Sequence, residues 1–281
     1  MNPDNNLKPI RIDLNDYDYA GEGANGASYN HKTDPSVMMK MYFRNFEAAA
    51  LELELSKKVY EAGIPTPEPG DLVTDGERMG IRFRRVMGKT SFARAAGNHP
   101  EQVVTLAQTF ATMCRQLHST HVDTTLFPNV KDHYLKLLAD NPFFSPEQKN
   151  KMRDFILSSP DADTALHGDL QFGNGIFVND QKYFIDLGDF CYGYPMYDLG
   201  MVYITCKLND EAFTQEVFHM DNATASKFWD AFAPVYFGAD ADLKAKEDEV
   251  RIYAGLKTLI IERDTHRPMP EFRAMLEGTI Y

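Results

Sequence analysis

The apolar and polar positions divide the chain into a strand-rich first part and a helical second part. Between Tyr17 and Tyr42, short apolar runs alternate with turn residues, which predicts three strands joined by a glycine turn and a second turn. Residues 46–62 are rich in Ala, Leu, Glu and Lys, which favours a helix. Gly63 and the prolines that follow it end this helix.

A hairpin is expected next, with strands at 70–74 and 79–86 and a turn at Asp75-Gly76. Beyond Gly88 the apolar positions recur with the period of a helix. We therefore take Gly88 as the end of the strand-rich part.

The second part carries three predicted helices before its one hairpin. Residues 100–119 have a single apolar stripe, and residues 131–158 fit two further helices. A hairpin at 176–186 interrupts the pattern, turning at Asn179-Asp180. From Pro195 onward the chain is again predicted to be helical, apart from a proline-bearing segment near Arg267.

These elements predict an α+β fold of two lobes. A small β-rich N-terminal lobe would span residues 1–88, and a larger, mainly helical C-terminal lobe would span residues 89–281. A chain of 281 residues is long enough to bury a core in each.

Composition narrows the classes of function. The net charge is −12 and most of it falls after residue 90, which argues against a nucleic-acid surface. The acidic second part is compatible with a cationic ligand, although an acidic surface that only maintains solubility is the preferred explanation. No apolar run approaches the roughly 20 residues of a membrane span, and residues 1–13 lack the apolar stretch of a signal peptide. Three cysteines without a C-x-x-C pair predict reduced, partly buried thiols in a cytoplasmic protein: Cys114, Cys191 and Cys206.

The candidate chemistry centres on residues 166–174, which read L-H-G-D-L-Q-F-G-N, and on I-D-L-G ten residues further on. Phosphoryl transfer needs a group that orients the acceptor hydroxyl and oxygen ligands for Mg²⁺ on the ATP phosphates. Asp169 can orient the hydroxyl and accept its proton. Asn174 offers a neutral oxygen ligand and Asp186 a charged one, and His167 is expected to brace the loop. Each residue alone has an ordinary structural explanation as a cap or a turn, but the combined spacing favours catalysis.

Gly21, Gly23 and Gly26 form a G-x-G-x-x-G turn between two predicted strands. This position disfavours a dinucleotide-binding turn, which precedes a helix, and favours a flap whose backbone covers phosphates. Ser28 is a candidate for a further hydroxyl contact with the phosphates. A plain hairpin turn is the alternative.

Together these motifs resemble those of the aminoglycoside phosphotransferase and choline kinase-like family, small-molecule kinases that are distant relatives of the protein kinases. The resemblance spans roughly residues 17–200. It implies a protein kinase-like fold, ATP and Mg²⁺ as cofactors, Asp169 as the catalytic aspartate, and Asn174 and Asp186 as metal ligands. Phe172 departs from the family, many of whose members carry proline there.

The resemblance also assigns roles to residues outside the central motif. Lys40 would reach the ATP phosphates, although a lone lysine in a strand can also face solvent at a sheet edge. A helix carboxylate would orient it. Glu52 and Glu54 are the candidates and lie about 200° apart on a helix, so only one can face inward. We favour Glu52, because it falls eleven residues before Gly63, where relatives usually carry this carboxylate.

Five further residues have predicted roles outside the central motif. Val86 and Met87, where the lobes join, are candidates for adenine contacts or for simple core packing. Asp198 would hold the catalytic loop's backbone. His118 and His121 have the spacing of a zinc pair, but no second pair completes a site, so ordinary histidines at a helix end are expected.

Asp189 either lines the acceptor site or caps a turn. A set of aromatic residues either cradles a cationic acceptor or packs in the core: Tyr192, Tyr194, Trp229, Tyr236 and Phe237.

The favoured function is therefore transfer of the ATP γ-phosphate to a small-molecule hydroxyl, on a cationic amino alcohol, an aminoglycoside-like compound or a sugar. The alternatives are an inactive nucleotide-binding pseudokinase, a protein kinase and an interaction protein that binds no nucleotide. Against a protein kinase, Asp198 follows Asp186 by only twelve positions, and none of the residues between them is a serine or threonine.

Overall fold

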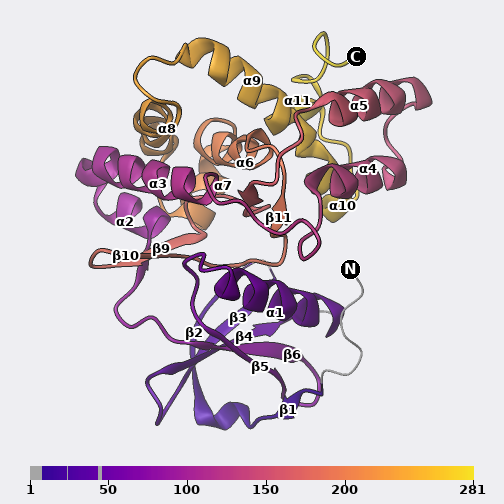
Figure 1. Cartoon of the computed structure of the whole chain (residues 1–281). Coiled ribbons are helices and arrows are strands. Elements are labelled where there is room, and N and C mark those ends of the chain that lie inside the picture. The colour runs from indigo at the N-terminus through magenta and orange to yellow at the C-terminus, as the bar shows by residue number, and fades with distance from the viewer. Residues whose placement is uncertain (1–7, 24, 44–45) are drawn as a thin grey trace. The chain divides into compact units, whose positions relative to one another are not determined.

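The structure is a computed structural model that describes residues 8–23, 25–43 and 46–281. The chain forms two compact units, each with its own core (Figure 1). The first unit consists of residues up to 90 together with 175–189, and the second of 91–174 together with 190–281. The expected α+β fold is confirmed, with strands in the first unit and mostly helices in the second.

The first unit is built on a six-stranded sheet. Its strands are β1 (Ile10–Arg11), β2 (Tyr17–Gly23), β3 (Gly26–His31), β4 (Val37–Tyr42), β5 (Pro69–Thr74) and β6 (Met79–Arg84). Their order across the sheet is β1-β5-β6-β4-β3-β2. Neighbouring strands pair antiparallel, except for β1 and β5, which are parallel. The predicted strands and the three predicted turns between them are therefore present.

Helix α1 (Phe46–Glu61) covers one face of this sheet, as Figure 1 shows. Ala49 and Leu53 of the helix pack with Leu72 and Ile81 of the sheet. On the opposite face a second apolar cluster forms from Tyr17, Met39, Met41 and Val73. Because side chains alternate along a strand, Lys40 points to the same face as Tyr42, the face that α1 covers.

A second hairpin completes the first unit, with strands β9 (Gly175–Val178) and β10 (Gln181–Phe184). It turns at Asn179, whose φ of 51° lies in the left-handed region that asparagine tolerates. The backbone N–H of Phe184 donates to the carbonyl of Pro65, 2.9 Å away, which ties the hairpin to the segment after α1. The sequence did not indicate that this hairpin joins the first unit. A functional division between lobes after Gly88 stays a prediction.

The second unit is mainly helical. Its helices are α2 (Phe92–Asn98), α3 (Val103–Leu117), α4 (Val130–Asp140), α5 (Pro146–Ser158), α6 (Met196–Lys207), α7 (Glu211–Phe218), α8 (Asn222–Phe237), α9 (Leu243–Leu256), α10 (Thr258–Thr265) and α11 (Pro270–Arg273). Two short strands, β8 (Ala165–Leu166) and β11 (Cys191–Tyr192), pair antiparallel. Strand β7 (Thr90–Ser91) lies where the first unit passes into the second along the chain. Helix α2 and the β8–β11 pair were not predicted.

The core of the second unit lies among α3, α6, α8 and α9. Helix α3 packs against α8, and α6 packs against both α8 and α9. The apolar stripe predicted on α3 is buried along its whole length. Gly200 allows α6 to approach α9 closely, since a Cβ there would lie 2.7 Å from the carbonyl carbon of Tyr253. The relative position of these two helices therefore depends on this glycine.

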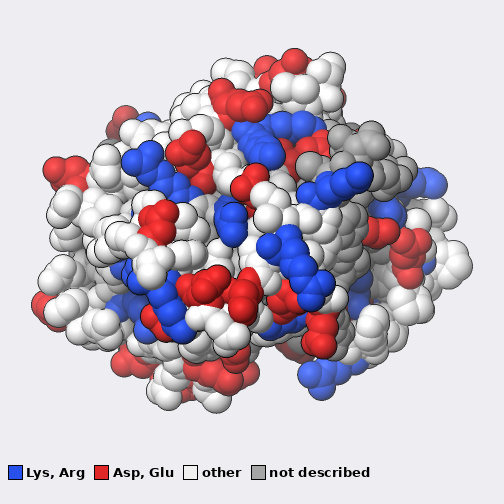
Figure 2. Space-filling model, turned by 90° about the horizontal axis from the view of Figure 1, so that it is seen from below, with Lys and Arg blue, Asp and Glu red and all other residues white. Residues whose placement is uncertain are grey.

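Charged side chains of both signs are distributed over the surface. On the face drawn in Figure 2, acidic and basic side chains are intermingled rather than gathered into areas of one sign. All three cysteines are buried, as expected. Among the described residues, we find no helix with the length and apolar character required to cross a bilayer.

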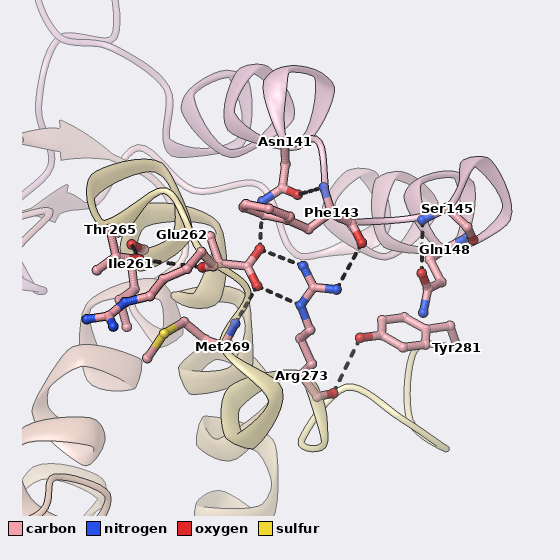
Figure 3. A network of polar contacts seen from close by, with 11 residues as sticks. Asn141, Phe143, Ser145, Gln148, Ile261, Glu262, Thr265, Met269, Arg273 and Tyr281 are labelled. Atoms are coloured by element: carbon pink, nitrogen blue, oxygen red, sulfur yellow. Dashed lines mark hydrogen bonds and ion pairs between the residues drawn. The ribbon is translucent and has the colours of Figure 1, made fainter.

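A buried polar network fixes the segment after α10 (Figure 3). The carboxylate of Glu262 accepts two hydrogen bonds from Arg273, at 2.6 and 2.8 Å, and one from Asn141 at 2.8 Å. The backbone N–H of Met269 donates to it as well, and Arg273 also donates to the carbonyl of Phe143. Burial alone would raise the pKa of Glu262, but the hydrogen bonds from Arg273 and Asn141 hold that pKa below its ordinary value.

We predict that Glu262→Gln lowers the free energy of unfolding at pH 7 by about 3 kcal/mol, because it removes a buried carboxylate and leaves the half-buried Arg273 without its counter-charge. The pKa of Glu262 is lower in the folded than in the unfolded protein, so its contribution is full above about pH 5 and is lost as the pH falls through the folded-state pKa. Urea unfolding should therefore be measured at pH 7 and at acid pH. The loss in free energy of unfolding caused by Glu262→Gln should be smaller at the acid pH.

The matched control is Glu147→Gln, because Glu147 pairs with Lys151 on the exposed surface of α5. Its effect should stay below about 0.5 kcal/mol at both pH values. A Glu262→Gln deficit that does not change with pH would contradict this account of the network.

Candidate active site

The loop between β8 and β9 brings Asp169 and Asn174 together, as expected from their spacing. The Asn174 side-chain N–H₂ donates to the backbone carbonyl of Asp169 at 2.9 Å and to its carboxylate at 3.0 Å. The amide of Gln171 in turn donates to the Asn174 Oδ1 at 3.2 Å. Asn174 is buried and Asp169 half-buried. The loop therefore presents one carboxylate and one amide oxygen in a fixed arrangement.

Asp198 of α6 holds this loop by its backbone. Its buried carboxylate accepts hydrogen bonds from the N–H of His167 at 2.7 Å and from the N–H of Gly168 at 2.9 Å. Burial raises the pKa of Asp198, but the hydrogen bond and charge of His118, with the nearby His167 and Lys257, outweigh this and keep the pKa below its ordinary value. The interpretation of Asp198 as a support for the loop is confirmed.

His118 extends this support in a way that the sequence did not indicate. Its Nε2 lies 3.1 Å from the Asp198 carboxylate, and its Nδ1 lies 2.6 Å from the hydroxyl of Tyr236 on α8. His121, in contrast, pairs with Asp163 on the surface. Within the described ranges, no three His, Cys, Asp or Glu side chains gather as a metal site. The two histidines therefore have different partners.

Phe172 anchors the far end of the loop. It is fully buried and packs against Phe218 of α7 and Phe228 of α8, with ring centroids 4.7 and 5.0 Å apart. Its carbonyl accepts the N–H of Ala93 at the start of α2. The residue that departs from the family pattern is therefore a packing contact that restrains the loop.

In the first unit, Lys40 lies between two carboxylates. Its ammonium contacts Glu52 on α1 at 2.9 Å and Asp186, which follows β10, at 2.5 Å. The buried hydroxyl of Tyr42 also donates to Glu52, and its ring lies under the Lys40 ammonium, 4.8 Å from the centroid. Glu54 instead pairs with Lys58 one helical turn away. The preference for Glu52 over Glu54 as the partner of Lys40 is confirmed.

The two carboxylates keep the Lys40 ammonium charged. Burial alone would lower the pKa of Lys40, but Asp186 and Glu52 raise it above its ordinary value. The backbone of Asp186 has a φ of 60°, which is uncommon for a residue other than glycine and is found mainly at functional or tight-turn positions. The carboxylate of Asp186 is about half exposed, whereas that of Glu52 is buried. Asp186 is therefore the partner that remains accessible to solvent and to a ligand.

The three glycines of the turn have different local explanations. Gly21 has a φ of 147° at an irregularity in the β2–β3 pairing. A Cβ on Gly26 would lie 2.3 Å from the carbonyl oxygen of Met41, so close strand packing requires this glycine. Around Gly23, nothing lies within 4 Å of a Cβ position and φ is not positive. Neither packing nor backbone conformation explains Gly23, which leaves room for close approach of a ligand. Ser28 pairs with Lys40 across β3 and β4 and shares its face of the sheet.

The candidates for adenine and acceptor contacts differ in their exposure to solvent. Val86 is half-buried, and Met87 is 53% exposed in the turn before Gly88, so Met87 is not a core residue. Trp229 is buried and stacks on Phe232, which confirms core packing for this ring. Tyr194 is half-buried, and its hydroxyl donates to Glu249 at 2.6 Å.

Of the other residues proposed from the sequence to contact the acceptor, Tyr192 and Phe237 are half-buried, and Asp189 is exposed. Burial raises the pKa of the Tyr194 phenol, and Glu249 raises it further. Tyr194 and Glu249 thus form a neutral donor and a charged acceptor at a partly exposed position of the second unit.

Comparison with known proteins identifies the family. Residues 20–234 match the family described as "Phosphotransferase enzyme family", and this range includes both Lys40 with its partners and the loop from Asp169 to Asn174. The chain belongs to this family. It is thus a small-molecule phosphotransferase with a kinase-like fold. A search of curated proteins finds no significant match.

Solved structures show the same fold at low identity. Amicoumacin kinase hAmiN, in complex with AMP-PNP, Ca²⁺ and Ami, has a TM-score of 0.58 and 15% identity over 95% of this chain and 87% of its own. A choline/ethanolamine kinase family protein from Mesorhizobium loti has a TM-score of 0.51 and 17% identity over 93% and 84%. A thermostable mutant of aminoglycoside phosphotransferase APH(4)-Ia, with ADP and hygromycin B, has a TM-score of 0.60 and 14% identity over 94% and 91%.

The sequence did not indicate several residues that contact Glu52 and Asp198. Tyr42 could have been found, because it lies two residues after Lys40 and therefore on the same face of the strand. Neither His118 nor Tyr236 has such a local signal, since each finds its partner through tertiary packing.

We predict that Glu52→Gln lowers phosphotransferase turnover by roughly 10-fold or more, because Lys40 loses the buried charge that orients it. Glu54→Gln is the matched control, because Glu54 lies on the opposite face of α1 and pairs with Lys58. Its turnover should be within about twofold of wild type. The measurement is steady-state transfer of phosphate from ATP. Similar losses in both variants would show that helix stability, not the Lys40 contact, is responsible.

Proposed function

We propose that this phosphotransferase transfers the γ-phosphate of ATP to a hydroxyl of a small molecule. The observation that carries the proposal is the catalytic loop, where Asn174 fixes the carboxylate of Asp169 and Asp198 fixes the backbone beneath it. Such a carboxylate can hold an acceptor hydroxyl in line with the phosphate and take its proton as the new bond forms.

The nucleotide-binding residues would come mainly from the first unit. Lys40, oriented by Glu52, would hold the ATP phosphates, with the backbone of Gly21, Gly23 and Gly26 over them and Ser28 on the same side. The open space at Gly23 supports this role. The backbone around Val86 and Met87 would contact adenine.

Asn174 and Asp186 would hold Mg²⁺, and their oxygen atoms fit this ion. Mg²⁺ prefers hard oxygen ligands and is commonly bound by one or two protein groups together with substrate phosphates. This preference agrees with the lack of a larger cluster of ligands among the described residues. When bound, the ion would neutralise the charge that develops on the phosphate oxygens.

The acceptor is proposed to be a cationic amino alcohol, an aminoglycoside-like compound or a sugar. The similar structures are named as kinases of such compounds or families, and the acidic composition suits a cation. Tyr194 and Glu249 are the candidates for contact, whereas Trp229 is taken up by the core. A cytoplasmic location and the absence of nucleic-acid binding remain predictions.

The alternatives have less support. A pseudokinase would be expected to lack one of the chemical positions, yet Lys40, Glu52, Asp169, Asn174 and Asp186 are all present. A protein kinase would need a long activation segment after the metal-binding aspartate, which this chain does not have.

We predict that ATP binds much more weakly without Mg²⁺, because the phosphates would lie beside the uncompensated carboxylate of Asp186. Isothermal titration calorimetry with ATP, in the presence of Mg²⁺ and then of EDTA, measures the difference. In Asp186→Ala the two affinities should become similar. Equal affinity with and without Mg²⁺ in the wild-type protein would count against the metal assignment.

We predict that Asp169→Asn reduces phosphate transfer by roughly 10²-fold or more while leaving Mg-ATP affinity within about threefold of wild type. The assay follows labelled γ-phosphate from ATP to a panel of aminoglycosides, amino alcohols, sugars and nucleosides. The variant keeps a side chain of the same size, so a loss of turnover reports the missing carboxylate. Wild-type turnover in Asp169→Asn would exclude Asp169 as the catalytic group.

A further inference from the structure

Lys257 is a buried lysine to which the proposed function gives no role. It lies where α9 ends and α10 begins, and it is 1% exposed. Its ammonium donates to the backbone carbonyl of Gly168 at 3.2 Å and lies 5.6 Å from the ring centroid of Tyr134. The residue after Gly168 is Asp169, so this lysine contacts the peptide unit that carries the catalytic aspartate.

Burying an ammonium group is costly unless its surroundings favour the charge. Burial alone would lower the pKa of Lys257, but Tyr134, Asp198 and Asp169 raise that pKa above its ordinary value. The end of α9 also favours a cation, because unpaired carbonyl groups gather at a helix C-terminus. The lysine therefore stays charged and keeps all its donors.

Gly168 is held by both of its polar backbone groups. Its N–H donates to Asp198 on α6, and its carbonyl accepts from Lys257 at the end of α9. The close approach of α6 and α9 at Gly200 sets the two charged side chains relative to each other. Gly168 has a φ of 85°, a conformation that glycine adopts readily but from which it also departs readily. A residue with such freedom needs outside contacts to keep one orientation.

We propose that Lys257 is a positioning residue for phosphate transfer, which fixes the Gly168 carbonyl and through it the orientation of Asp169. This proposal rests on the proposed function of Asp169. The competing explanation is that Lys257 is a core lysine whose contacts contribute only to stability. The two explanations differ in what they predict for kcat in a folded variant.

The test uses hydrolysis of Mg-ATP by the full chain, with water as the acceptor, followed by phosphate release. Lys257→Met keeps the length of the side chain but removes the donor, and Lys257→Arg keeps a charged donor. Lys149→Met is the control, because Lys149 donates to the carbonyl of Ala139 at 2.9 Å on the exposed surface. Each variant is measured well below its own thermal midpoint.

We expect Lys257→Met to lower kcat by about 10- to 100-fold while KM for ATP changes less than about twofold. Lys257→Arg should recover most of the loss, and Lys149→Met should equal wild type. A folded Lys257→Met with kcat within twofold of wild type would overturn the proposal. So would a loss that Lys257→Arg does not reduce.

Two further measurements keep the outcome decisive. If Lys257→Met does not fold, Lys257→Gln takes its place; its shorter neutral donor should still lower kcat by at least about threefold, and wild-type kcat would overturn the proposal. Asp169→Asn, measured in parallel, distinguishes failure of the proposed function from failure of the proposed role of Lys257. Normal hydrolysis in Asp169→Asn would show that the proposed function itself has failed, whereas loss in Asp169→Asn with normal kcat in Lys257→Met would reject only the role of Lys257.

Discussion

The loop that carries Asp169 depends on the buried carboxylate of Asp198. Asp198 is buried, yet it remains an acceptor for two backbone N–H groups and faces a histidine. A buried charge is tolerated only when such partners compensate for lost hydration. Conversely, the N–H groups of His167 and Gly168 would lose their partner without it. The position of the loop and the charge state of Asp198 therefore support each other.

The first unit uses charge in a different way. Lys40 touches two carboxylates, of which Glu52 is buried and also bonded to Tyr42, while Asp186 is half exposed. Breaking the contact of Lys40 with Asp186 costs less free energy than breaking its contact with Glu52, because water can solvate the half-exposed carboxylate of Asp186. Glu52 thus serves as the permanent orienting group, and Asp186 is the carboxylate that can turn toward a cation.

The sequence predicted most elements of the fold, because apolar periodicity and turn residues are local signals. It placed Lys40 on a strand, favoured Glu52 correctly, and read Asp198 as a support for the loop. It could not place His118 or Lys257, whose partners lie 80 and 89 residues away in the chain. A lysine at a helix end ordinarily faces solvent, and only tertiary packing puts this one beneath the loop. The inclusion of residues 175–189 in the first unit was likewise decided by packing, as the contact of Phe184 with Pro65 shows.

The close approach of α6 and α9 at Gly200 has a consequence for the way the protein loses structure. Asp198 lies two residues before this glycine, and Lys257 follows the helix that packs against it. The loop therefore cannot open without either separating these helices or breaking its contacts with Asp198 and Lys257. Segments tied in this way open together as one cooperative unit. On heating, the catalytic loop should stay ordered up to the temperature at which the helical core itself melts.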